Sequence, residues 1–165
     1  MKNLTTTICL TIAVLFGCAG VCKSADFDKG WTAYESSDFA TALREWTPLA
    51  EQGDARAQYK LGMMYHNGQA VPQDYKTAVK WYTLAAEQGN APAQVNLAWM
   101  YRKGLGVPQD NKTAVKWYTL AAELGGVLNQ YDLGYLYYNG DIVPKDYKTA
   151  VKWYTLAAEQ GYASA

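Results

Sequence analysis

The sequence has little of the chemistry on which most enzymes and metal proteins depend. Its 165 residues include one histidine, His66, and three cysteines, all within the first 22 positions. A single histidine excludes zinc sites built from several histidines, and without later cysteines neither a zinc ribbon nor a Cys/His catalytic pair can form. The chain has no Gly-x-Ser-x-Gly motif and no glycine-rich phosphate loop followed by lysine. We therefore predict no catalytic residue, no metal and no cofactor, and a protein that is not an enzyme.

The sequence also lacks an excess of charge and the composition of a disordered chain. Lysine and arginine together number 15, against 15 aspartate and glutamate residues, and 50% of the residues are hydrophobic. Nucleic-acid-binding proteins normally carry surplus lysine and arginine that displace counterions from phosphates, so the balance argues against a nucleic-acid partner. The hydrophobic fraction is high enough to form a packed core.

Residues 1–25 have the three-part layout of a Sec signal peptide. Lys2 supplies the basic start, residues 8–16 form an almost unbroken apolar run, and small residues follow. The run is too short to span a bilayer as a permanent helix, which predicts export to the periplasm or the medium without stable membrane insertion. Cleavage is expected after Ser24 or Ala25. It takes away two lysines and no acidic residue, and leaves 13 basic and 15 acidic residues.

The same leader contains an alternative processing signal. Leu15-Phe16-Gly17-Cys18 resembles a bacterial lipobox, in which the cysteine is lipidated and becomes the first residue of the mature protein. A lipid anchor at Cys18 is therefore the alternative to soluble export. Cleavage after residue 24 or 25 would instead leave a mature chain without cysteine, which packing alone would have to stabilise.

A repeat of 36 residues organises the rest of the chain. The string Lys-Thr-Ala-Val-Lys-Trp-Tyr-Thr-Leu-Ala-Ala-Glu occurs at residues 76–87, 112–123 and 148–159. Self-similarity at a fixed period of roughly 20–50 residues is typical of a solenoid. A divergent fourth copy with a shorter internal loop precedes these three. The predicted segments are a signal peptide at 1–25, a divergent first repeat at 26–56, and repeats at 57–92, 93–128 and 129–165.

Each repeat has the pattern of two helices. In the first full copy the second helix is expected to begin at Asp74, whose carboxylate can cap the first turn, and to end at Gly89. Apolar positions between these residues recur at three- and four-residue intervals along one face. The first helix is expected to run from Asp54 to Asn67 and to end at Gly68. The same signals in every copy predict an all-α array of eight helices.

The repeat pattern resembles that of the Sel-one-like repeat (SLR) family, relatives of the tetratricopeptide repeats. It reads Ala-x-x-x-Leu-Gly-x-x-Tyr-x-x-Gly, then Val-Pro-x-Asp-x-x-x-Ala-x-x-Trp-Tyr-x-x-Ala-Ala-x-x-Gly. The resemblance covers nearly the whole mature chain, with residues 26–56 closer to a tetratricopeptide-type repeat. It implies an α/α right-handed superhelical solenoid of antiparallel helix pairs that acts as a scaffold or adaptor for protein complexes, often in exported bacterial proteins.

Two departures from the family pattern matter for function and packing. Some members are built with regular cysteine pairs and have been described as β-lactamase-like. That cysteine pattern is absent here, so an envelope hydrolase or β-lactamase-like protein is kept only as the alternative function. At the junction of the last two repeats Asn129 replaces the small Ala57 and Ala93, and residues 125–128 differ from residues 89–92. We expect altered helix packing at this junction.

Comparison of the copies with one another separates packing positions from recognition positions. Identical positions, such as Leu61, Tyr65 and Trp81 with their counterparts, are expected to be needed for stacking. Gly62 and the small residues at its counterparts are expected to let helices approach closely. Four positions of the first helix instead differ between copies and lie on one side of that helix, at i, i+3, i+6 and i+7. These columns are Lys60/Asn96/Asp132, Met63/Trp99/Tyr135, His66/Arg102/Tyr138 and Asn67/Lys103/Asn139.

The variable columns predict a binding surface. First helices usually line the concave side of such solenoids, and Trp, Tyr and Arg supply most binding hot spots. We predict that a protein or peptide partner is bound by a strip of seven residues: Lys60, Met63, His66, Trp99, Arg102, Tyr135 and Tyr138. The alternative interpretation is a solvated or partly packed face whose residues have drifted.

The two outer surfaces of the array have simpler interpretations. The repeated lysine pairs of the second helices, such as Lys76 and Lys80, are interpreted as a solvated face. The last helix, with Trp153 and Leu156, is expected to lack a covering repeat. Either the chain is a piece of a longer protein or this end pairs in a homodimer, so a self-assembling structural protein is a third functional interpretation.

Overall fold

The computed structural model describes residues 25–162. The predicted signal peptide up to residue 24 and the predicted lipid anchor at Cys18 lie outside the described residues. Within residues 25–162 the chain forms eight helices and no strand: α1 (Phe27–Glu35), α2 (Phe39–Glu51), α3 (Ala55–Asn67), α4 (Tyr75–Glu87), α5 (Ala91–Lys103), α6 (Asn111–Glu123), α7 (Val127–Asn139) and α8 (Tyr147–Glu159). In that range no helix combines the length and apolar character that a membrane crossing requires.

The helices begin and end at the capping residues that the sequence predicts. The carboxylate of Asp74 accepts hydrogen bonds from the backbone N–H groups of Lys76 and Thr77, and Asp110 and Asp146 cap α6 and α8 in the same way. Each satisfies donors that the first turn of a helix leaves free. At the other end of α3, Gly68 has a φ of 69°, a left-handed conformation that residues with a Cβ rarely adopt. The predicted caps and the array of eight helices are confirmed.

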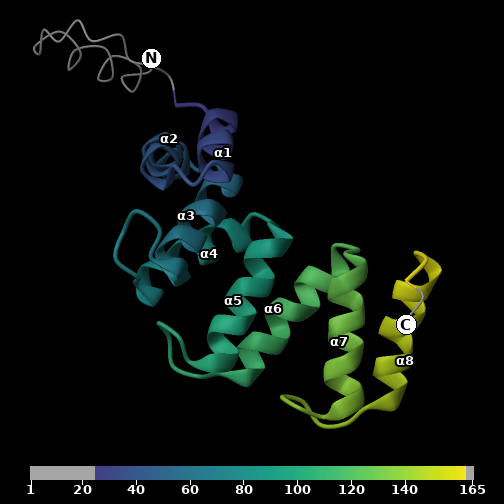
Figure 1. The fold of residues 1–165 in the computed structure, drawn as a ribbon. Helices are drawn as coiled ribbons and strands as arrows, with labels where there is room; N and C mark the ends of the chain where they lie inside the picture. Colours follow the sequence, from purple (N-terminus) through teal and green to yellow (C-terminus); the bar gives the residue numbers. More distant parts are fainter. Residues whose placement is uncertain (1–24, 163–165) are drawn as a thin grey trace, which may run out of the picture.

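The helices pack in antiparallel pairs, and each pair packs mainly against the pairs before and after it. The pairs follow one another from α1 and α2 at the purple end to α7 and α8 at the yellow end (Figure 1). Three hydrophobic clusters lie along this array in place of one central core. The predicted all-α repeat solenoid is confirmed, because a chain of short-range contacts of this kind defines a solenoid.

The repeated apolar positions form these clusters, with one correction. Leu61, Leu97 and Leu133 are at most 1% exposed, as their identity in the three copies predicts. The prediction that the three repeated tryptophans are core residues is confirmed for Trp153, which is 7% exposed, and wrong for Trp117 and Trp81, which are only half-buried. Trp81 packs against a cluster formed by residues of α1, α2 and α3. The neighbouring Tyr82, 1% exposed, is the aromatic residue that fills the centre of its repeat.

Close helix approach at position 62 is confirmed. A Cβ placed on Gly62 would lie 2.5 Å from the Tyr82 ring, so only glycine lets that ring press onto α3. Gly134 has the same relation to Tyr154 on α8, at 2.9 Å. The equivalent residue of the middle repeat is Ala98, and the equivalent tyrosine, Tyr118, is half-buried.

The junction between α6 and α7 is altered, as expected from its sequence. The N-cap of α7 is Gly126, which has no side chain to accept from the first turn, whereas Asn90 caps α5. Asn129 is half-buried and donates from Nδ2 to the carbonyl oxygen of Ala121 at 3.3 Å. The two helices pack less extensively than α4 and α5 do.

Candidate functional site

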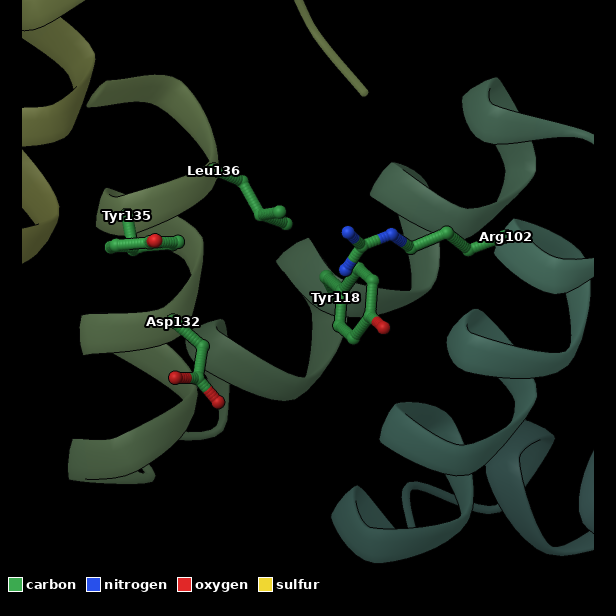
Figure 2. Close-up of a pocket in the computed structure, with 5 residues that line it drawn as sticks. All are labelled: Arg102, Tyr118, Asp132, Tyr135 and Leu136. Carbon is green, nitrogen blue, oxygen red and sulfur yellow. The ribbon is translucent and has the colours of Figure 1, made fainter. Parts of the chain in front are cut away.

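Two adjoining hollows form a groove across the middle of the array. The larger, of about 450 Å³, is lined by residues from α3, α5, α6 and α7: His66, Val95, Asn96, Trp99, Tyr118 and Asp132. The smaller, of about 240 Å³, is lined by Arg102, Tyr118, Asp132, Tyr135 and Leu136 (Figure 2). Tyr118 and Asp132 belong to both hollows and join them. We call the combined surface the central groove.

One wall of the central groove is a cluster of aromatic rings. The His66 and Trp99 rings stack with their centroids 5.5 Å apart and their planes 20° apart. Tyr82 places its hydroxyl 3.4 Å from Nδ1 of His66, and Tyr75 meets the imidazole edge-on. Burial lowers the pKa of His66, so the imidazole is neutral at neutral pH. Packing fixes the position of Trp99, and a rigid indole face is a good binding surface.

The charged groups of the groove come from two helices, Arg102 from α5 and Asp132 from α7. Arg102 forms an ion pair with Asp141, in the loop that follows α7. Asp132 has no ion pair and no side-chain hydrogen bond with any residue in the described range 25–162. Asp132 is an exposed residue, and partial desolvation of its carboxyl group raises the pKa of that group. In Figure 2 Asp132 lies on the α7 side of the pocket, and the Arg102 guanidinium lies next to the Tyr118 ring.

The predicted binding strip is only partly assembled in this groove. His66, Trp99, Arg102 and Tyr135 line it. The other three predicted residues are not among its lining residues: Lys60, Met63 and Tyr138.

These three residues make contacts elsewhere in the chain. Lys60 places Nζ 4.1 Å from the centroid of the Trp31 ring, within a set of four aromatic rings, and burial lowers its pKa. Met63 packs against the central hydrophobic cluster. Tyr138 is exposed and meets the ring of Tyr147 on α8 edge-on, with 5.6 Å between centroids.

Five lining residues were missed by the predicted strip: Val95, Asn96, Tyr118, Asp132 and Leu136. Asn96 and Asp132 lie in a variable column, but they were left out because neither is a typical hot-spot residue. Tyr118 belongs to an identical column that was assigned to packing. No signal in its own column distinguishes Tyr118 from the buried Tyr82.

The groove has the chemistry of binding and none of the clustered groups of a metal centre. Within the described part of the chain no group of three or more His, Cys, Asp or Glu side chains is placed to hold a metal ion. The available groups are ring faces, a guanidinium, amides and one carboxylate, which suit recognition of a polypeptide.

Comparison with known proteins identifies the repeat. The family model described as Sel1 repeat matches residues 55–90, 91–126 and 130–162, one match for each full helix pair. Comparison with the curated proteins gives no match.

Solved structures with the same repeat are similar over most of the chain. A protective antigen of uropathogenic Escherichia coli with an SLR fold is 43% identical with a TM-score of 0.75, and the match covers 82% of this chain and 30% of the antigen. A Sel1 repeat protein of Oxalobacter formigenes is 36% identical with a TM-score of 0.76, covering 83% of this chain and 56% of that protein. Cysteine-rich protein B of Helicobacter pylori shares the fold at 24% identity and a TM-score of 0.59, over 77% of this chain and 91% of that protein.

This chain thus spans less than two thirds of the first two of these proteins. The family model matches most of the sequence, and it does so in register with the helix pairs α3–α4, α5–α6 and α7–α8. The resemblance read from the repeat pattern is confirmed, and the chain belongs to the Sel1 repeat family.

Proposed function

We propose that the chain is a non-catalytic scaffold that binds a protein or peptide partner in the central groove. Sel1 repeat proteins are in general protein–protein interaction scaffolds and generally lack catalytic activity. The observation that carries the proposal is the composition of the groove. Most of its lining residues differ between repeats, although the residues that stack the repeats are the same. Positions that packing leaves free to vary are where a specific partner would be recognised.

The test is a pulldown from the cell-envelope fraction with Trp99→Ala plus Tyr135→Ala. Trp99 lines the groove and Tyr135 is 51% exposed, so the double variant removes two large contact surfaces from one face. We expect loss of the captured partner with an unchanged circular dichroism spectrum, since loss of each hot-spot ring costs about 2 kcal/mol of binding or more.

The matched control removes two exposed side chains outside the groove, Leu84→Ala plus Tyr147→Ala. It should capture the partner as the unmodified protein does. Capture by the groove variant at the level of this control would contradict the proposal.

We propose export to the periplasm or the medium as the location of this activity. The basic start, apolar run and small residues of positions 1–25 support it. The similar E. coli protein is a protective antigen, which is consistent with export. Sequencing of the N-terminus from fractionated cells tests both processing routes. A mature chain that begins at Ala25 or Asp26 supports soluble export, whereas lipid attached to Cys18 would show anchoring.

A second candidate, self-assembly through α8, is supported by one specific observation. The identical string that forms α4 and α8 is covered in α4 and uncovered in α8: Val79 is 8% exposed, while Val151 is 62% exposed. A second copy could cover this face. Light scattering tests the proposal, because Val151→Lys should abolish association seen at high concentration, and a monomer at all concentrations would overturn it.

A further inference from the structure

One column of the repeat changes from a cation to an anion along the array. Lys60 on α3, Asn96 on α5 and Asp132 on α7 occupy equivalent positions. At the first of these the chain supplies its own cation to a set of aromatic rings. Nζ of Lys60 lies 4.1 Å from the centroid of Trp31 and 5.4 Å from that of Tyr59, within the range of cation–π attraction.

At the third position the chain supplies aromatic rings and an anion, without a free cation. Asp132 lies beside Tyr118 in both hollows, and Trp99 lines the larger hollow with it. Arg102 is the cation that lines the groove, and its guanidinium is already paired with Asp141. Asp132 is an exposed residue and forms no ion pair within residues 25–162, so its carboxylate can pair with a cation of a partner.

We propose that the central groove takes an arginine side chain of its partner, with the guanidinium bound by Asp132 and stacked on the ring of Trp99. A planar guanidinium can donate two parallel hydrogen bonds to one carboxylate and lie flat on an aromatic ring at the same time. An apolar or acidic side chain in this place would cover Asp132 without pairing it, which is unfavourable. The inference rests on the proposed function, because it names what the groove holds.

The experiment uses four peptides that differ at one residue. They have the sequence Gly-Leu-Ser-X-Ser-Leu-Gly with both ends capped, and X is arginine, lysine, norleucine or glutamate. Titration into ¹⁵N-labelled protein is followed by NMR. We expect the arginine peptide to shift the amide signals of Trp99, Tyr118 and Asp132, and to bind about tenfold more tightly than the norleucine peptide, with lysine between them.

Two variants test whether the preference for the arginine peptide depends on Asp132. Asp132→Asn removes the charge with little change of shape and should bring the ratio of arginine to norleucine affinity close to one. Glu123→Gln removes an exposed carboxylate of α6 that does not line the groove and should leave the ratio as it is.

The outcomes separate this inference from the proposed function. Equal affinity of the arginine and norleucine peptides, a ratio unchanged by Asp132→Asn, or no binding of the arginine peptide would overturn the arginine site. The groove would still be a binding surface if the partner were lost in the Trp99→Ala plus Tyr135→Ala pulldown. Shifts confined to residues outside the groove, together with normal capture by that variant, would overturn both.

Discussion

At the scale of single residues, buried glutamines join neighbouring repeats. Gln58 donates from Nε2 to the carbonyl oxygen of Ala50 and accepts a hydrogen bond from Gln88 at its Oε1. Gln130 makes the equivalent pair with Gln160, 30 positions further on. Such buried amides are stabilising only when both ends are paired. The column Gln58/Gln94/Gln130 is identical in sequence, but the polar residue type gave no indication that these side chains are buried.

Gln94 is the exception, and it leads to a prediction. Its Oε1 is buried without a partner, because the residue equivalent to Gln88 and Gln160 is Leu124, which is 55% exposed. Leu124→Gln should donate to Gln94 Oε1 and raise the free energy of unfolding by about 1 kcal/mol in urea denaturation. Leu128→Gln, an exposed leucine of the same junction, is the control and should change it little. Equal effects of the two substitutions would rule out the missing hydrogen bond.

Gly62 leads to a second prediction at this scale. Alanine is the better helix former by about 1 kcal/mol, yet its methyl group would lie 2.5 Å from the Tyr82 ring. We expect Gly62→Ala to lower the free energy of unfolding by about 1–3 kcal/mol, because the ring is buried and cannot move freely. In a Tyr82→Leu background the same substitution should cost much less. A stabilising Gly62→Ala would show that α3 and α4 separate easily.

At the scale of helices, one sequence produces three different environments. The same thirteen residues form α4 and α8, and α6 differs from them only at its first residue. Helix formation follows from propensity, apolar periodicity and the aspartate caps, so it can be predicted locally. The burial of a side chain cannot be predicted locally, because it depends on which helix packs next to it. Tyr82 is buried under α5, whereas the equivalent Tyr154 of α8 remains half-buried.

The aspartate caps predict how stability depends on acid. The pKa values of Asp74, Asp110 and Asp146 are lowered by hydrogen bonds from the hydroxyl group and the backbone N–H of Thr77, Thr113 and Thr149, respectively. In the unfolded chain these groups titrate near 3.9, so the stability that they contribute is complete above about pH 4 and is lost as the pH falls through their lower folded pKa values.

The matched variants are serine at all three caps, which keeps an acceptor without this titration, and glutamine in place of Glu87, Glu123 and Glu159 near the ends of the same helices. In urea denaturation between pH 2 and 6, the serine variant should lose less stability on acidification than the unmodified protein. The glutamine variant should keep the original slope. A serine variant with the original slope would contradict the capping account.

At the scale of the whole molecule, the fold was more predictable than the groove. The period of 36 residues and the caps determined the eight helices, because they act within a repeat. The groove combines residues from four helices, and one of its lining residues, Arg102, forms an ion pair with Asp141 of the next repeat. Such contacts act between repeats, so comparison of columns found Trp99 and missed Tyr118.

The most direct test of the central groove is site-specific photo-crosslinking in the native cell envelope. A photoreactive phenylalanine analogue replaces either Val95, which lines the groove, or Leu84 on α4, which lies outside the groove. The groove account predicts a discrete adduct from position 95 that disappears in the Trp99→Ala plus Tyr135→Ala background, and none from position 84. An adduct from position 84 with none from position 95 would contradict it.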